Sequence, residues 1–93
     1  MIRTFADRHT ENVWNRIPVR RWPVAVQRAA YRKLLIIDAA ETPQDLNIPP
    51  GNRLEKLAGD RRGQHSIRIN DQWRICFYWR NGDAEKVEIT DYH

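Results

Sequence analysis

Apolar side chains recur at every second position over residues 73–79, with Arg74, Cys76 and Tyr78 between them. A period of two is typical of a strand that has one buried side. The Asn81-Gly82 pair that follows favours a type I′ turn, because both central residues of that turn need a positive φ. The pattern therefore predicts a strand that reverses direction into the next segment.

Three further strands are predicted around this one, over residues 53–57, 64–70 and 84–90, and residues 1–5 form a candidate edge strand. Short connectors rich in Gly, Asn and Asp join the strands, which favours an antiparallel meander. One side of this sheet is apolar and is expected to pack on helices. The other side is expected to face solvent or a substrate, and it carries Ser66, Arg68, Arg74 and Tyr78.

Two amphipathic helices are predicted before the sheet, over residues 7–17 and 23–40. Thr10 is the candidate N-cap of the first helix, and Pro23 suits the first position of the second, where no N–H is needed. In the second helix apolar residues recur with helical spacing, at Val26, Ala30, Leu34 and Ile37. Helices followed by a run of strands indicate an α+β fold. We therefore expect one domain over residues 1–93, with an N-terminal strand and a two-helix hairpin packed on a small antiparallel sheet.

The chain of 93 residues has a net charge of +4 and a pI near 9.7, which favours a polyanionic partner without requiring one. No apolar run approaches the ~20 residues of a membrane span, and no signal-peptide core opens the chain. The single cysteine, Cys76, cannot form an internal disulfide and is expected to pack in the strand. A cytoplasmic protein that does not associate with membranes is predicted.

Nucleotide-binding motifs and metal-ligand spacings are absent from the sequence, so no metal or other cofactor is expected. RNA supplies its own nucleophile, the 2′-OH, and metal-free cleavage needs a base, an acid and fixed positive charge on the phosphate. His93 suits the proton transfers, Asp91 can orient it or accept the proton, and Tyr92 can stack on a base or donate a hydrogen bond to phosphate. Arg74 can hold phosphate oxygens in bidentate fashion.

Each of these residues also has an ordinary structural role open to it. A terminal His93 is commonly frayed, Tyr92 can be a rim aromatic and Asp91 a strand-end cap, while Arg74 can form a cross-strand ion pair. The basic side of the second helix likewise can be a solvated surface, or can lie along RNA or an acidic partner; it carries Arg28, Arg32 and Lys33.

Several segments form a specific combination: Gly59-Asp60-Arg61-Arg62-Gly63, Ser66-Ile67, Trp73-Arg74-Ile75-Cys76-Phe77 and Asp91-Tyr92-His93, together with residues 1–5 and 46–49. Together they resemble the HigB-type toxins of the RelE/ParE superfamily across essentially the whole chain. The resemblance implies a ribosome-dependent endoribonuclease that cuts mRNA in the ribosomal A site. It also implies neutralisation by a HigA-type helix-turn-helix antitoxin, with operator DNA bound only through the toxin–antitoxin complex. The active-site residues implied by position are Arg74, Asp91, Tyr92 and His93.

The chain departs from this family where several members have H-P-L-K before the Gly-Asp pair. It has Glu55-Lys56-Leu57-Ala58 instead, so that Glu55 is the candidate base and Ala58 stands where a lysine is usual. Arg61 and Arg62 are the predicted replacements for the missing charge and Lys56 is a partial substitute, with Arg68 as a further phosphate-binding residue. A weaker nuclease, or one with redistributed cationic contacts, is expected.

Three functions are compatible with this sequence. The first is the mRNA endoribonuclease, the second is a non-nucleolytic toxin of the same fold, as ParE-like relatives are on DNA gyrase, and the third is a basic binding module for a regulator. Arg74 with Asp91-Tyr92-His93 favours the first, because these residues supply both proton transfer and a phosphate clamp.

Overall fold

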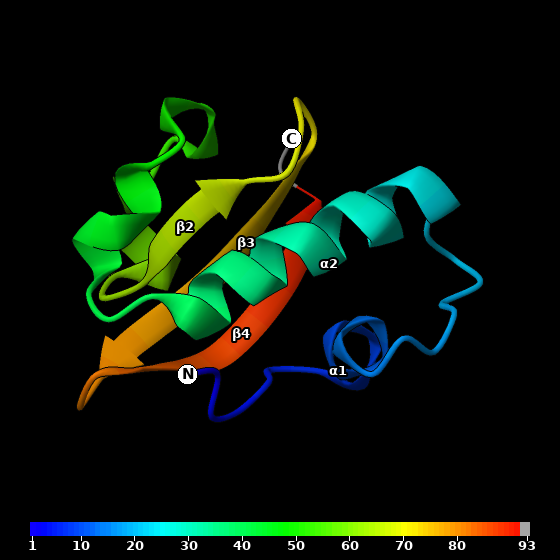
Figure 1. Ribbon diagram of the computed structural model, residues 1–93, viewed down its shortest axis with the longest axis horizontal. Coiled ribbons are helices and arrows are strands. Elements are labelled where there is room, and N and C mark those ends of the chain that lie inside the picture. Colours follow the sequence, from blue (N-terminus) through cyan, green and yellow to red (C-terminus); the bar gives the residue numbers. More distant parts are fainter. Residues whose placement is uncertain (92–93) are drawn as a thin grey trace.

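A four-stranded antiparallel sheet with the order β1-β2-β3-β4 lies behind helix α2 in the computed structural model, which describes residues 1–91 (Figure 1). Helix α1 lies beside β4 and contacts both β4 and α2. The helices are α1 (Arg8–Trp14) and α2 (Val24–Ala39), and the strands are β1 (Glu55–Lys56), β2 (His65–Arg68), β3 (Trp73–Arg80) and β4 (Asp83–Asp91). Three 3₁₀ turns, η1 (Pro43–Asn47), η2 (Pro50–Asn52) and η3 (Gly59–Arg61), fill the connections. The predicted α+β fold is confirmed.

The predicted apolar stripe of α2 is confirmed, since Val26, Ala30, Leu34 and Ile37 are all buried. They join one core with the apolar residues of the sheet, which include Ile67, Ile75, Phe77, Val87 and Ile89. Full burial of one such side chain contributes roughly 1.5–3 kcal/mol. The position of α2 on the sheet is therefore fixed mainly by this apolar contact.

Helix α1 is shorter than predicted and begins differently. Its N-cap is Asp7, whose Oδ1 accepts a hydrogen bond from the Thr10 backbone N–H at 2.7 Å, so the prediction that Thr10 is the N-cap is wrong. Thr10 is instead completely buried, and its Oγ1 accepts a hydrogen bond from the Ile89 backbone N–H at 2.9 Å. This side chain joins α1 to β4.

Thr10→Val is expected to lower the free energy of unfolding by about 1–3 kcal/mol, because it leaves the buried Ile89 N–H without its acceptor. Urea denaturation measures the loss. Thr4→Val is the matched control: Thr4 Oγ1 accepts from the Lys86 N–H at 2.8 Å, but at an exposed position where water can replace it. Equal losses in the two variants would contradict this role for Thr10.

Two strand boundaries differ from the predictions. The strand expected over residues 53–57 is reduced to β1, because Arg53 follows η2 with a left-handed φ of 47°. The strand expected over residues 64–70 ends at Arg68, and the Asn70 Oδ1 then accepts from the Gln72 and Trp73 N–H groups in a tight turn. The β3–β4 turn is as predicted, with φ of 52° at Asn81 and 83° at Gly82.

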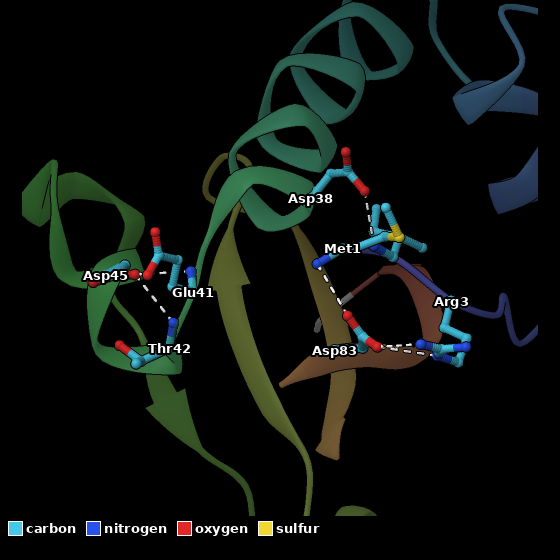
Figure 2. Close-up of polar contacts among 8 residues, drawn as sticks. Met1, Arg3, Asp38, Glu41, Thr42, Asp45 and Asp83 are labelled. Carbon is cyan, nitrogen blue, oxygen red and sulfur yellow. Dashed lines mark hydrogen bonds and ion pairs between the residues drawn. The ribbon is translucent and has the colours of Figure 1, made fainter. Parts of the chain in front are cut away.

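The N-terminal segment joins the sheet along β4 through isolated parallel bridges, Ile2 to Ala84 and Phe5 to Val87, so the predicted edge pairing is confirmed without a continuous strand. Figure 2 shows how Asp83 anchors this segment: its carboxylate pairs with the Met1 ammonium and with the Arg3 guanidinium. The hydrogen bond from Arg3 holds the pKa of Asp83 below its usual range. These two ion pairs hold residues 1–3 beside the β3–β4 turn.

The side of the sheet away from α2 was predicted to face solvent or a substrate, and at its centre this is wrong. Ser66 and Cys76 are fully buried, and the Arg74 side of β3 is covered by the chain around Arg53 and by the side chain of Arg61. Burial raises the pKa of the Cys76 thiol. The prediction that Cys76 packs is confirmed.

Candidate active site

Three predicted site residues lie on the same side of the sheet, away from α2. Glu55 pairs with Ser66, and Arg68 pairs directly with Arg74 across β2 and β3. Because strand side chains alternate, the Ser66 and Arg68 side chains share one side, and the register brings Glu55 and Arg74 to it. The structure therefore brings together Glu55, Arg68 and Arg74, which come from three different strands.

The Arg74 guanidinium is held by the protein itself. Its Nε donates to Ser66 Oγ at 2.9 Å and its Nη2 donates to the Arg53 carbonyl at 2.8 Å, while Glu55 Oε2 lies 3.8 Å from Nη2. Only 8% of Arg74 is exposed. These contacts fix the plane of the guanidinium fork, so the orientation is already set before a ligand binds.

A hollow of about 220 Å³ opens beside this guanidinium. Its wall is polar and is lined by Arg53, Glu55, Arg68, Asn70, Asp71 and Arg74. Arg68 forms an ion pair with the exposed Asp71, and Glu55 is about half exposed at the rim. Arginine groups on the wall suit an anionic group such as a phosphate, and a carboxylate at the rim can accept a proton there.

The remaining cationic residues of the prediction lie elsewhere. Lys56 pairs with His65, so alternation places its side chain on the opposite side of the sheet from Glu55. Arg61 donates from η3 to Glu88 Oε1 at 2.9 Å, and Arg62 is exposed at the end of η3. The structure does not bring Lys56, Arg61 or Arg62 into the wall of the Arg74 hollow.

Asp91 lies at the end of β4, directly across from Trp73, and its Oδ2 accepts a hydrogen bond from Gln72 Nε2 at 3.0 Å. Thr90, one residue earlier, pairs with Arg74. Alternation therefore puts Asp91 on the side of Trp73, next to the strand end that carries Arg74. Tyr92 and His93 lie outside the described residues, and their roles stay predictions.

Sequence reasoning missed the groups that orient Arg74. The Arg53 carbonyl is an acceptor only because η2 turns the chain over the sheet, and no local pattern shows this. Ser66 was placed on the polar side but given no role. The register pairs it with Cys76, two positions from Arg74 on the same side of β3, which brings its hydroxyl within reach of the guanidinium.

His65 belongs to the other side of the sheet, where its ring stacks on Phe77 with centroids 5.9 Å apart. Burial lowers the pKa of the His65 imidazole below its ordinary 6.5, and the neighbouring Lys56 ammonium lowers it further. The imidazole is thus favoured in its neutral form, away from the Arg74 hollow.

This shift has an expected effect on stability. Well above pH 6.5 both folded and unfolded states hold neutral His65, but as the pH falls the unfolded state takes up the proton first, so the native state loses stability. His65→Phe is expected to flatten this loss on the acid side, as measured by urea denaturation from pH 7.5 to about pH 5. A decline of the same steepness in both proteins would contradict the assignment.

The same fold occurs in solved toxin–antitoxin structures. All of this chain superposes on 98% of one chain in a YoeB–YefM complex from Staphylococcus aureus, with a TM-score of 0.63 and 15% sequence identity, a likeness of fold alone. Another structure, a heterotetrameric YoeB–YefM toxin–antitoxin complex from the same organism, gives the same values.

The family is shown by sequence. Residues 3–93 match the model of the HigB-like toxins, described as RelE-like toxins of the type II toxin–antitoxin system HigB, and the chain belongs to this family. It is 50% identical over 62 residues to Toxin HigB-1 of Vibrio cholerae serotype O1, and 41% identical over 61 residues to Endoribonuclease HigB of Proteus vulgaris. These alignments cover 67% and 66% of this chain and 65% of each relative.

Residues 1–91 contain no helix that is both long enough and apolar enough to cross a membrane.

Proposed function

We propose that this chain is the toxin of a type II toxin–antitoxin pair and acts as a ribosome-dependent endoribonuclease on mRNA. The observation that carries the proposal is the Arg74 guanidinium, fixed by Ser66 and the Arg53 carbonyl beside a hollow that also holds Glu55 and Arg68. The relative named Endoribonuclease HigB, 41% identical to this chain, supports the same reaction class.

In the proposed reaction the 2′-OH of the ribose attacks the adjacent phosphorus, and the bond to the 5′-oxygen of the next nucleotide breaks. One group accepts the proton of the 2′-OH, and another gives a proton to the departing 5′-oxygen. Glu55 at the rim is a candidate for the first role and His93 for the second, with Asp91 orienting His93. Arg74 stabilises the charge that develops on the phosphate oxygens, and Tyr92 stacks on a base or donates to phosphate.

Cationic residues outside the hollow have a separate role in this proposal. Three cations are too widely placed to act on one phosphate, because they lie in the turn and on the other side of the sheet: Arg61 on η3, Arg62 directly after η3, and Lys56 on β1. They contact neighbouring phosphates along the RNA strand, where each adds affinity that salt weakens. Ala58 provides no such contact, so the rate of cleavage depends strongly on Arg74.

Induced expression tests the function. Translation is expected to stop, and the remaining mRNAs are expected to carry new 5′ ends at positions that follow the codon frame. Purified protein should cleave message only on programmed ribosomes. Intact mRNA together with altered DNA supercoiling would overturn this proposal in favour of gyrase inhibition, and growth arrest with neither change would favour a binding module.

The proposed neutralising partner is a HigA-type helix-turn-helix antitoxin, and operator DNA is bound by the pair through that antitoxin. Support comes from the family's place in type II toxin–antitoxin systems and from the fold shared with toxins solved in YoeB–YefM complexes. A toxin that acts on translating ribosomes works in the cytoplasm. Co-expression with the protein of the adjacent reading frame is expected to restore growth.

A further inference from the structure

The wall of the Arg74 hollow holds a cation that has no role in the sequence-based prediction. Arg53 lies two residues before β1, and its side chain lines the hollow together with Arg68 and Arg74. The cations predicted to supply additional charge, Lys56, Arg61 and Arg62, are not part of this wall. Arg53 therefore brings positive charge to the place where the predicted residues do not.

The charges on the wall of the hollow do not cancel. Three arginines and two carboxylates line it, which leaves an excess of one positive charge. Asp71 pairs with Arg68, and Glu55 Oε2 lies 3.8 Å from Arg74 Nη2. Within residues 1–91 no carboxylate forms a corresponding ion pair with the Arg53 guanidinium, so the excess charge belongs to Arg53. One phosphodiester group, with a single negative charge, matches this excess.

The backbone of Arg53 has a conformation that arginine rarely adopts. Its φ of 47° and ψ of 60° lie in the left-handed region, where a Cβ atom crowds the backbone and glycine is favoured. Hydrogen bonds on both sides of the residue impose this conformation. The Arg53 N–H donates to the Pro50 carbonyl at 3.1 Å, and the Arg53 carbonyl accepts from Arg74 Nη2 at 2.8 Å. A strained non-glycine residue at the wall of a binding site is typical of a functional side chain.

The turn that carries Arg53 is anchored to helix α2. Asn52, the residue before it, is completely buried, and its Oδ1 accepts a hydrogen bond from Lys33 Nζ on α2. Asn52 Nδ2 donates to the carbonyls of Leu46 and Ile48, at 3.3 and 3.4 Å. These contacts fix the backbone of Arg53 beside the hollow, although its side chain is exposed.

We propose that Arg53 is a second phosphate-binding residue of this site, with separate roles for its backbone and its side chain. Its carbonyl orients the Arg74 guanidinium, while its own guanidinium donates to the non-bridging oxygens of the phosphate in the hollow. Arg74 is held in one orientation by the protein, whereas the exposed Arg53 side chain can follow the phosphate as negative charge develops on it. The inference rests on the proposed function, since it assigns a substrate contact in the same hollow.

Arg53→Gly isolates the contribution of the side chain, because glycine adopts the left-handed conformation without strain and keeps the carbonyl that orients Arg74. The single-turnover rate of cleavage on programmed ribosomes is expected to fall about 10–10²-fold. This loss is smaller than for a buried donor, because water screens an exposed charge. Arg53→Lys keeps the charge but not the planar fork, and it is expected to recover part of the rate.

Arg16→Gly is the matched control. Arg16 is also an exposed arginine with a left-handed φ, of 64°, but it lies over the Tyr31 ring and does not line the hollow. Both substitutions remove one positive charge and release the same backbone constraint. Arg16→Gly is expected to cleave at the normal rate. Equal losses in the two variants, or an unchanged rate in Arg53→Gly, would overturn the inference.

A binding measurement separates this inference from the nuclease activity. The probe is a dinucleotide whose 5′ nucleotide carries a 2′-O-methyl group, so that it has a phosphodiester but no attacking hydroxyl. In a ¹H–¹⁵N NMR titration of the full chain, the Nε–Hε resonances of Arg53 and Arg74 are expected to shift together, while that of Arg16 stays in place. An Arg53 resonance that does not move up to the highest dinucleotide concentration would refute the phosphate contact, whether or not the chain cleaves mRNA. Shifts at both residues in a chain that leaves mRNA intact would refute the nuclease proposal and support the phosphate contact.

Discussion

Arg74→Lys is expected to lower the rate of mRNA cleavage on programmed ribosomes by about 10²–10³, although the charge is kept. A lysine ammonium has no planar fork, so it cannot donate to Ser66 Oγ and the Arg53 carbonyl and also hold two phosphate oxygens. Single-turnover cleavage of a message in the A site measures the loss, with growth arrest as the readout in cells.

Arg80→Lys is the control, because Arg80 lies at the other end of β3, is exposed and lies over the Tyr78 ring. Thermal unfolding of both variants separates a loss of catalysis from a loss of fold, since Arg74 is largely buried. If Arg80→Lys slowed cleavage as much as Arg74→Lys, the Arg74 hollow would not be the active site.

A chain that ends at Asp91 is expected to lose toxicity, and His93→Gln alone is expected to slow cleavage by about 10²–10⁴. The reason is chemical: removing the imidazole removes the group suited to protonate the departing 5′-oxygen near neutral pH. The pH dependence of the single-turnover cleavage rate measures this loss. The decrease in rate at high pH, which reports deprotonation of the general acid, should disappear in His93→Gln.

His9→Gln provides the comparison, because His9 lies on α1, where its ring packs against Trp22 and contacts Arg21, and it does not line the Arg74 hollow. It is expected to cleave at the normal rate. Undiminished growth arrest by the chain that ends at Asp91 would remove the catalytic assignment of Tyr92 and His93, and Glu55 would then be the first residue to examine.

Local patterns in the sequence were sufficient for most of the fold. The alternation over residues 73–79, the Asn81-Gly82 turn and the spacing of Val26, Ala30 and Leu34 each describe a geometry that short-range sterics and burial decide. They predicted β3, the β3–β4 turn and the buried side of α2. The start of α1 was missed because Asp7 and Thr10 are both good caps, and only the contact of Thr10 with β4 separates them.

The burial of Arg74 was not predictable in this way. A period of two tells which residues share one side of a strand, but not what covers that side. Arg74 is covered by the turn before β1, where Arg53 takes a left-handed conformation and its carbonyl accepts a hydrogen bond from the guanidinium. That contact spans 21 residues of sequence, beyond the reach of any local pattern.

The candidate site was predicted in part. The motif around Arg74 and the position of Glu55 led to two groups that the structure holds 3.8 Å apart, and Arg68 lies across from them. Lys56 was expected to replace a missing charge, but β1 is only two residues long and adjacent strand residues point to opposite sides. A shift of one position therefore decides whether a cation reaches the hollow.

The Arg74 guanidinium is held in its ligand-ready orientation by the protein itself. Among residues 1–91, Ser66 Oγ and the Arg53 carbonyl already accept hydrogen bonds from this guanidinium, so its orientation does not require a rearrangement of β1 or β2. Under the proposed function, activity would then have to be restrained from outside, by a partner that covers the hollow or keeps the molecule from the ribosome. Under the same proposal, a cell would need the neutralising partner to be present before this chain accumulates.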